Sequence, residues 1–358
     1  MPAYVAALCT ELDQVGRGCP AEVHTIFFGG GTPSLLPLPL LQQIFASIHR
    51  SYRLTPDVEI TLEANPGTLN REYLDGLLGL GINRLSLGVQ SANPSELQLL
   101  EREHDYPDVI RAVAWARSAG IRNLNLDLIF GLPYQHLESW KATLELALGL
   151  APEHFSLYNL ILEHGTPLNA WVERGLLSAP DDDRAADMYE WALARMAQAG
   201  YRHYEISNWA RQSGANGLLA CRHNLQYWRG EPYLGIGAGA HGYAAQVRTA
   251  NVRAPQAYID RQAQGAPRPF PRSAATVNVT PIAPSTAMRE LMMVGFRLLE
   301  EGIPRKAFQR LFGCDPWDIF AGELSRLQET GLVESTPDCW RLTPRGVMLG
   351  NQVFMQFV

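Results

Sequence analysis

The segment LGINRLSLGVQ, residues 80–90, decides the fold class, because a helix ends and a strand begins within it. Glycine followed by a β-branched or aromatic residue is typical of a helix C-terminus, where glycine adopts the left-handed backbone conformation. The residues that follow, Arg84–Gln90, are largely apolar, as in a strand whose faces are covered by helices. The same stop recurs at Gly120 and Gly200, each before a candidate strand. These three copies predict a repeated strand–helix architecture.

The remaining elements follow from the periodicity of apolar residues. Strands are predicted at His24–Gly30, Glu59–Asn65, Arg84–Gln90, Asn123–Phe130 and His154–Leu162. Helices are predicted between them, at Leu38–Ser51, Arg71–Leu80, Pro94–Leu100, Tyr106–Ala119 and Leu137–Leu150. Strands that alternate with helices in units of about 25 to 40 residues indicate an α/β fold with a parallel sheet. The run PDDD, residues 180–183, predicts the N-cap of a further helix.

The C-terminal part of the chain has a different character. Residues 248–284 are rich in Ala, Pro, Gln and Arg with little periodicity, which predicts a linker or covering loop. Beyond them, helices are predicted at Met288–Leu299, Arg305–Phe312 and Glu323–Gly331, and strands at Leu332–Glu334 and Trp340–Thr343. This order resembles a small winged-helix-like α+β domain. We therefore divide the chain into a barrel with its downstream motifs (1–247), the linker or covering loop (248–284) and a C-terminal domain (285–358).

Length and charge narrow the class of protein. At about 150 residues per domain, 358 residues predict two domains. Apolar residues make up 46% of the chain and charged residues 18%, which excludes a disordered chain. A formal net charge of −6 argues against binding to nucleic acid or anionic membranes through charge. The only lysines are Lys141 and Lys306, and neither stands in a P-loop motif.

The five cysteines, Cys9, Cys19, Cys221, Cys314 and Cys339, are scattered and show no CxxC spacing. They predict neither a disulfide framework nor a zinc ribbon, and a reducing compartment suits them. The N-terminus has no basic region before its apolar residues, so no signal peptide is predicted. No apolar run is long enough to cross a membrane. Together these features predict a cytoplasmic protein.

Glycines and polar residues mark the ends of the predicted strands, where α/β proteins bind their ligands. The first strand ends in GGGTP, residues 29–33, which permits either a tight turn or close approach of the backbone to a carboxylate. Glu63, Gln90 and Asp127 stand at or near the ends of the next three strands. Burying a polar or charged side chain in a strand costs free energy unless the group finds a partner. Each of these three residues is therefore either a satisfied structural group or a ligand contact. Their number favours one shared ligand site.

A second group of motifs lies downstream, at residues 204–210 (YEISNWA), 221–228 (CRHNLQYW) and 235–242 (GIGAGAHG). Aromatic residues close to His223 and His241 suit a flat apolar ligand, with or without a metal. Taken alone, His223 is better interpreted as a surface or core histidine than as a ligand. The run GIGAGAHG does not open a clear βαβ unit, so a dinucleotide-binding fingerprint is rejected.

Taken together, the motifs resemble those of a known family. The segments IFFGGGTPSLLP, EITLEANPGT, GINRLSLGVQS, LNLDLIFGLP and YEISNWA, which begin at residues 26, 59, 81, 124 and 204, resemble the radical SAM enzymes of the coproporphyrinogen oxidase-like group. Residues 223–228 match HNxxYW, the pattern that marks the HemW heme chaperones within that group. The resemblance covers nearly the whole chain.

The resemblance implies a partial (β/α)6 TIM-like barrel that binds S-adenosylmethionine (SAM) beside a [4Fe–4S] cluster. It implies that the methionine end of SAM is held by Gly30, Gly31 and Thr32, and that further contacts come from Glu63, Gln90, Arg102 and Asp127. It also implies heme binding, with His223 as the contact. These roles suit a glycine turn that exposes N–H groups and hydrogen-bonding side chains at strand ends.

The sequence departs from the family at the cluster. The family holds its cluster with a CxxxCxxC motif, and this sequence contains none. Cys9 and Cys19 are ten residues apart, and Cys9 falls within the helix that follows the family's cluster loop. We therefore expect the first barrel strand and the cluster loop to be missing. A start codon assigned too far downstream is the favoured explanation, and a genuinely clusterless protein is the alternative.

Three functions remain open on the sequence. The HNxxYW motif favours a heme chaperone that passes heme to acceptor proteins, with respiratory proteins among the candidates. The alternative is an oxygen-independent coproporphyrinogen III dehydrogenase that uses radical SAM chemistry, and the third is an inactive relic with a binding role. The expected partners are heme and heme-accepting proteins, without nucleic acid and without a membrane segment. Whether the chain is an enzyme is left open.

Overall fold

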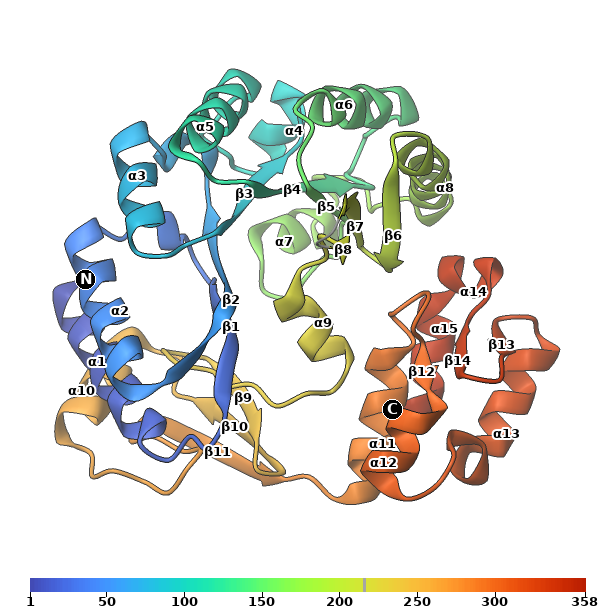
Figure 1. The fold of residues 1–358 in the computed structure, drawn as a ribbon. Coiled ribbons are helices and arrows are strands. Elements are labelled where there is room, and N and C mark those ends of the chain that lie inside the picture. Colours follow the sequence, from blue (N-terminus) through green and yellow to red (C-terminus); the bar gives the residue numbers. More distant parts are fainter. Residues whose placement is uncertain (215–216) are drawn as a thin grey trace. The chain divides into compact units, whose positions relative to one another are not determined.

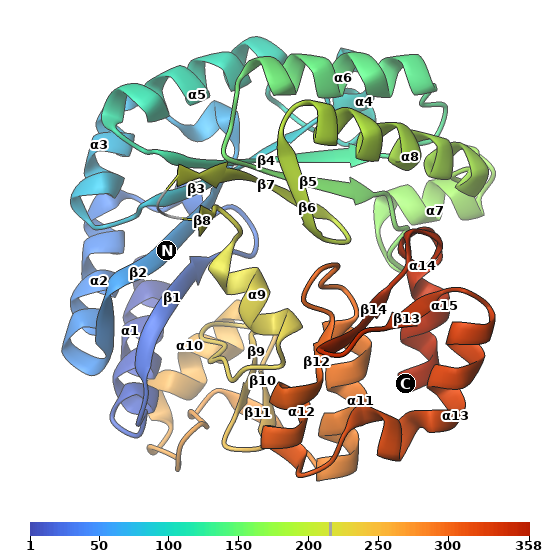
Figure 2. The ribbon, with the colours of Figure 1, turned by 45° about the vertical axis from the view of Figure 1, so that its right-hand side comes forward.

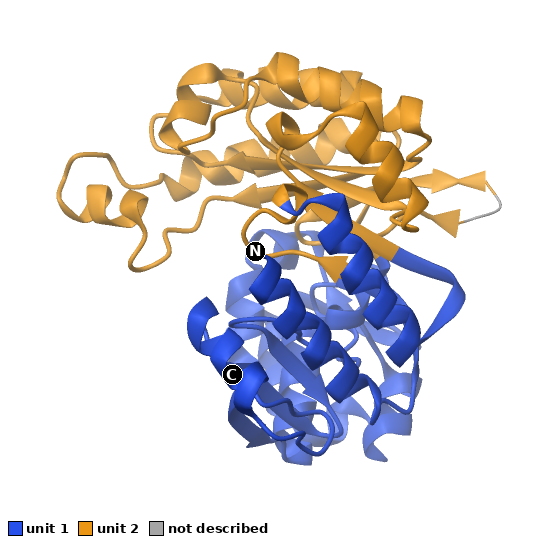
Figure 3. Ribbon diagram, turned by 90° about the vertical axis from the view of Figure 1, so that its left-hand side faces the viewer, with its two compact units in different colours: residues 1–26, 36–59, 222–358 blue, residues 27–35, 60–221 orange. Residues whose placement is uncertain are grey.

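The computed structural model describes residues 1–214 and 217–358, which form two compact units (Figure 3). Unit 1 consists of residues 1–26, 36–59 and 222–358. Unit 2 consists of residues 27–35 and 60–221. Each unit is therefore assembled from segments that are distant in the sequence.

The largest sheet carries the predicted strand–helix units (Figures 1 and 2). Its strands are β1 (Glu22–Phe28), β2 (Arg53–Ala64), β3 (Arg84–Gln90), β4 (Asn123–Phe130), β5 (His154–Asn159), β6 (Tyr201–Glu205), β7 (Asn208–Ser213) and β8 (Gly217–Leu218). Their order is β1-β2-β3-β4-β5-β7-β6, with β8 beside β7. The pairs from β2 to β5 are parallel, whereas β7 runs antiparallel to β5 and β6. The sheet is a half-barrel of mixed strands, which confirms the predicted α/β class.

The helices of unit 2 are α3 (Arg71–Gly79), α4 (Pro94–Leu99), α5 (Tyr106–Ala119), α6 (Leu137–Gly149), α7 (Pro167–Glu173) and α8 (Asp182–Gln198), with the short 3₁₀ turns η1 (Pro33–Leu35) and η2 (Pro66–Thr68). Of these, α5, α6 and α8 lie along one side of the sheet, as Figure 2 shows. Nearly every residue of β3 is buried, so both of its faces are covered.

The predicted bounds agree with the structure for elements whose own sequence carries both an apolar pattern and end signals. β3, β4, α5 and α2 (Leu38–Ser51) begin and end as predicted. The glycines of the three helix stops, Gly81, Gly120 and Gly200, have φ of +93°, +107° and +80°, the left-handed conformation that such stops require. Asp181 caps α8 by accepting a backbone N–H, as the run PDDD predicts.

Residues 248–284 contain regular structure, in contrast to the predicted linker or covering loop. β10 (Val247–Asn251), α10 (Pro255–Gln264) and β11 (Thr276–Pro281) form there, and β10 pairs with β11 and with β9 (His241–Ala244). The periodicity is weak because β11 is exposed along nearly its whole length, while α10 is fixed by its packing on α1 (Pro2–Gly16). The domain bounds drawn at residues 247 and 284 stay a prediction.

The C-terminal part of unit 1 adds elements to the predicted helices and two strands. It contains α11 (Pro284–Gly295), β12 (Ile303–Pro304), α12 (Arg305–Phe312), α13 (Pro316–Glu329), β13 (Val333–Ser335), β14 (Cys339–Leu342), α14 (Pro344–Met348), α15 (Gly350–Phe354) and the 3₁₀ turn η4 (Met355–Phe357). The third strand, β12, pairs with β14 through two residues, too short a run to leave a sequence signal.

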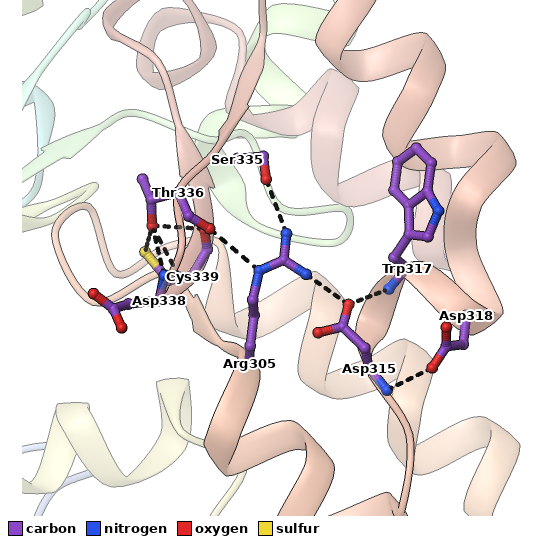
Figure 4. A network of polar contacts seen from close by, with 8 residues as sticks. All are labelled: Arg305, Asp315, Trp317, Asp318, Ser335, Thr336, Asp338 and Cys339. Carbon is purple, nitrogen blue, oxygen red and sulfur yellow. Dashed lines mark hydrogen bonds and ion pairs between the residues drawn. The ribbon is translucent and has the colours of Figure 1, made fainter.

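Arg305 joins the helices of this region to its β-hairpin (Figure 4). Its guanidinium donates to Asp315 Oδ1 at 2.7 Å, to the hydroxyl of Ser335 at 2.8 Å and to the carbonyl oxygen of Thr336 at 3.2 Å. Asp315 is also the N-cap of α13 and forms a capping box with Asp318. The network therefore has a structural role, because it holds α12, the start of α13 and the β-hairpin together.

Within residues 1–214 and 217–358, we find no helix with the length and apolar character needed to cross a membrane.

Candidate functional site

The glycine turn that follows β1 exposes its backbone. Gly30 and Gly31 have φ of +80° and +64°, a conformation that glycine adopts without strain. A Cβ atom at either position would have no atom within 4 Å, so this side of the backbone faces open space. At Gly29, by contrast, a Cβ would lie 2.8 Å from the ring of Phe27. The turn thus leaves room for a ligand to approach the backbone at Gly30 and Gly31.

Glu63, at the end of β2, points toward this turn. Its Oε2 accepts the N–H of Gly30 at 3.3 Å. Burial raises the pKa of Glu63, and the nearby carboxylate of Asp127 raises this pKa further. The sequence left open a satisfied structural group or a ligand contact, and the protein contact found is a backbone amide. A half-buried carboxyl group with a raised pKa is a common feature of ligand sites.

Asp127, within β4, is hydrogen-bonded inside the protein. Its Oδ2 accepts the hydroxyl of Ser86 at 2.9 Å, and its Oδ1 accepts the amide of Asn125 at 2.8 Å. Burial nevertheless raises the pKa of Asp127, an effect that these hydrogen bonds oppose. The structure therefore brings Asp127, Glu63 and the glycine turn into one electrostatically linked group.

Gln90 closes β3 in a backbone conformation that residues other than glycine rarely adopt. Its φ is +65°, and the register between β3 and β4 shifts between Gly88 and Gln90. Such strained residues cluster at ligand sites. The Nε2 atom of Gln90 lies 2.9 Å from the position that a Cβ would take at Gly88, so glycine there makes room for this side chain.

Arg102 and Thr32 complete the predicted set. The Nε atom of Arg102 is buried and has no hydrogen-bond partner within the described ranges. A buried guanidinium N–H without a partner is a group that a carboxylate ligand can satisfy. Burial, followed by the charge of Arg102, lowers the pKa of His104, whose Nε2 lies 3.1 Å from the carbonyl oxygen of Val89 beside Gln90. Thr32 is half-buried directly after the glycines.

A buried polar chain behind Asp127 is absent from the sequence predictions. His154 in β5 is fully buried, with Nδ1 at 2.6 Å from Asn125 Oδ1 and Nε2 at 2.8 Å from the hydroxyl of Tyr204. The amide group of Asn125 donates to Ser86 and Asp127, so its Oδ1 accepts from His154. Burial lowers the pKa of His154 well below its usual value, so the ring is neutral. These hydrogen bonds hold Asn125 in place, and Asn125 in turn donates to Asp127.

The second predicted region forms α9 (Arg222–Trp228) in unit 1. Glu59 of β2 anchors its first turn: Oε2 accepts the N–H of Arg222 at 3.2 Å, and Oε1 accepts the N–H of His223 at 3.1 Å. A carboxylate at this position satisfies N–H groups that a helix leaves without internal partners. Glu59 thereby fixes the start of α9 against β2.

His223 has hydrogen-bonding neighbours at both ring nitrogens. Its Nδ1 lies 2.9 Å from Thr25 Oγ1, and its Nε2 lies 3.0 Å from the hydroxyl of Tyr227. The ring of Tyr227 stands edge-on to the rings of His223 and Tyr233, with centroid separations of 4.9 and 4.6 Å. This group of aromatic side chains around a histidine suits a flat, largely apolar ligand.

The other residues of the downstream motifs have different surroundings. His241 is exposed at the start of β9, where it pairs with Ala250. Cys221 is buried in unit 2, and its N–H donates to the hydroxyl of Tyr204 at 3.3 Å. Gly237 of the GIGAGAHG run donates its N–H to Glu11 at 2.8 Å. This contact ties the GIGAGAHG run to α1 through a buried carboxylate.

The described residues do not fit a [4Fe–4S] cluster. The five cysteines are free thiols, and no three His, Cys, Asp or Glu side chains within residues 1–214 and 217–358 are placed to hold a metal ion. The residues at the strand ends do fit SAM, because the open glycine turn leaves room for its methionine end and the Nε atom of Arg102 has an N–H without a partner among the described residues.

The fold and these motifs define a class of protein. Residues 11–147 match the Radical SAM superfamily, and residues 282–349 match the HemN C-terminal domain. Among solved structures, coproporphyrinogen III oxidase (HemN) from Escherichia coli, a radical SAM enzyme, matches with a TM-score of 0.82 at 23% identity, covering 99% of this chain and 82% of that chain. The chain therefore has a HemN-like radical SAM fold.

Curated relatives narrow the class further. The heme chaperone HemW of Synechocystis sp. is 39% identical, covering 98% of this chain and 86% of that protein. The heme chaperone HemW of Bacillus subtilis is 35% identical, covering 99% of this chain and 91% of that protein. This chain belongs to the HemW family, which confirms the resemblance found in the sequence. The individual SAM and heme contacts stay predictions.

Proposed function

We propose that this chain binds heme at His223 and passes it to acceptor proteins in the cytoplasm, on a scaffold that also binds SAM. The observation that carries the proposal is the geometry of α9, where His223 is held at both ring nitrogens beside Tyr227 and Tyr233. The names of the relatives, heme chaperones at 35% and 39% identity, support it. Neutral imidazole nitrogen is a common axial ligand of heme iron.

Titration with hemin tests the heme site. The wild-type chain is expected to give a Soret band, and His223→Ala is expected to weaken hemin binding by at least about tenfold, because the imidazole is lost. His164→Ala is the control, since that side chain is 95% exposed. Equal hemin affinity of His223→Ala and the wild type would contradict the assignment and make His241 and Cys221 the next residues to test.

We further propose that the strand ends of unit 2 hold SAM. The residues are Gly30, Gly31 and Thr32 for the methionine end, and Glu63, Gln90, Arg102 and Asp127 for the remaining contacts. Three observations support this set: the open backbone of the glycine turn, the strained backbone of Gln90 and the buried Nε atom of Arg102. When bound, SAM would supply oxygen atoms that accept hydrogen bonds from N–H donors of this set, such as the Nε–H of Arg102.

Gly30→Ala is expected to weaken SAM binding by about tenfold, because a methyl group would enter the space left for the ligand. Gly313→Ala is a matched control, since both glycines have φ near +80° and open space where a Cβ would lie. Both substitutions are expected to cost about 1 kcal/mol of stability through backbone strain. Equilibrium dialysis with labelled SAM and thermal unfolding separate the two effects. Equal SAM affinity of Gly30→Ala and Gly313→Ala would refute the contact.

The oxidase alternative requires a cysteine triplet that the five cysteines of this chain do not form. These five cysteines offer no cluster ligands for a radical step. Anaerobic incubation with coproporphyrinogen III provides the test, and conversion at an enzymatic rate would overturn the chaperone proposal. A chain that neither binds hemin nor converts this substrate would instead support the inactive relic.

A further inference from the structure

The hydrogen bonds around His223 form a chain whose direction is set at its far end. The carbonyl oxygen of Pro232 only accepts hydrogen bonds, so its partner must be the amide group of Gln226, Nε2. The Oε1 atom of Gln226 is consequently turned toward Thr25, 3.0 Å from its Oγ1. Because an amide oxygen also only accepts, Thr25 donates its single hydroxyl proton to Gln226.

The direction of the chain determines the tautomer of His223. Thr25 has no second proton, so at 2.9 Å it accepts the proton of Nδ1–H from His223. A neutral imidazole has one N–H, so Nε2 carries a lone pair. The hydroxyl of Tyr227, 3.0 Å away, donates to that lone pair. Thr25 and Gln226 are both buried, which limits competition from water for these bonds.

We infer that Thr25 and Gln226 are positioning residues that present Nε2 of His223 to heme iron, and that Tyr227 covers this atom until heme binds. The inference rests on the proposed heme site and adds the identity of the binding atom and of the group that competes for it. Iron binds the same lone pair that accepts a hydrogen bond, so Tyr227 and iron cannot share Nε2. The bond from Nδ1–H to Thr25 stays in place and orients the ring, as outer partners do at metal sites.

The tautomer can be measured without heme. In protein labelled with ¹⁵N-histidine, the ¹⁵N chemical shifts of His223 at neutral pH are expected to show Nδ1–H, with His223→Ala assigning the signal. Thr25→Val removes the acceptor at similar side-chain volume and is expected to shift the ring toward Nε2–H. Thr25→Ser keeps the hydroxyl and is expected to keep the tautomer. An Nε2–H signal in the wild-type protein would overturn the inference, whatever the result with heme.

Hemin titration of the same variants tests the consequence. Thr25→Val is expected to lower hemin affinity by about tenfold, with Thr25→Ser close to the wild type. Tyr227→Phe removes the competing hydroxyl and is expected to raise affinity by about fivefold. A lower affinity of Tyr227→Phe, with an unchanged far-UV spectrum, would show that Tyr227 supports heme, and would overturn the competing role. If the wild type gives no Soret band, the proposed function fails, while the tautomer measurement still tests the hydrogen-bond chain.

Discussion

Replacing Glu11 by alanine is expected to lower the free energy of unfolding of unit 1 by about 3 kcal/mol or more. Glu11 lies on α1 and is 1% exposed. Its Oε1 accepts from Asn251 Nδ2 at 2.7 Å and from Ser273 Oγ at 2.5 Å. Its Oε2 accepts from the N–H of Gly237 at 2.8 Å and from the hydroxyl of Tyr258 at 2.6 Å. Without the carboxylate, four buried donors lose their acceptor, at about 1–3 kcal/mol each before relaxation.

Glu11→Gln gives a finer test because it keeps the shape of the side chain. Each carboxylate oxygen faces one N–H donor, from Asn251 on one side and from Gly237 on the other. The NH₂ group of glutamine must face one of these donors in either orientation, so a loss of about 2 kcal/mol is expected. The stability of Glu11→Gln is therefore expected to lie between that of the wild type and that of Glu11→Ala.

Urea unfolding measures the loss of stability in both Glu11 variants. Hydrogen exchange on peptides from α1 and α10 shows where the loss occurs. Glu22→Ala, at an exposed residue where β1 begins, is the control and is expected to stay within about 0.5 kcal/mol of the wild type. A Glu11→Gln variant as stable as the wild type, with unchanged exchange in α10, would contradict the anchoring role of this carboxylate.

The Glu11 cluster also shows why residues 248–284 escaped prediction. Its partners Asn251, Tyr258 and Ser273 lie 240, 247 and 262 residues from Glu11 along the chain. Local periodicity cannot report contacts over such separations, and these contacts order the segment. By contrast, β3, β4, α2 and α5 carry their own apolar pattern and end signals, so the sequence predicted their bounds.

The site could be predicted in part for the same reason. Glu63 and Asp127 stood out because a carboxylate within an apolar run is visible locally. Their surroundings depend on strand register, which places Asn125 opposite Ser86 on one side and His154 on the other. The sequence does not contain this register, so the buried chain behind Asp127 was missed. A cue was present in the alternating polar residues of NLNLDL, residues 123–128.

The motif around His223 was also predictable only in part, because some of its contacts are local and others join distant residues. The spacing of His223 and Tyr227 places both on one face of a helix, and the sequence alone indicated a histidine among aromatic residues. Thr25, which sets the direction of the hydrogen bond at Nδ1, lies 198 residues away on β1. Its role emerges only when β1 and α9 are placed together within unit 1.

Mild acid is expected to destabilise unit 2, because His154 and His203 are neutral in the folded chain. Burial lowers the pKa of His203 to about 4 and the pKa of His154 well below its usual value. The ring of His203 stacks on Trp209 with centroids 4.1 Å apart. An unfolded histidine has a pKa of about 6.5, so the folded and unfolded chains bind different numbers of protons below that pH.

The direction in which stability changes with pH follows from this difference in bound protons. The stabilising contribution of each histidine is fully present above about pH 6.5 and is lost as pH falls, because the unfolded chain then gains a proton that the folded chain does not. The free energy of unfolding falls by about 1.4 kcal/mol per pH unit for each histidine, which amounts to about 3 kcal/mol for His203 by pH 4. The raised pKa values of Glu63 and Asp127 act in the opposite direction.

Variants isolate the histidine contribution from that of the carboxyl groups. His203→Phe keeps an aromatic ring on Trp209 and removes the titrating group, so its urea-derived stability is expected to fall less steeply between about pH 6.5 and 5. The difference is about 1 kcal/mol per pH unit, because the unfolded ring is only half protonated at about pH 6.5. His164→Gln changes a side chain that is 95% exposed and is expected to follow the wild-type slope. The comparison uses slopes, so any constant loss of stability in His203→Phe cancels. Parallel slopes for His203→Phe and the wild type would show that His203 takes up its proton in the folded chain, contrary to its burial against Trp209.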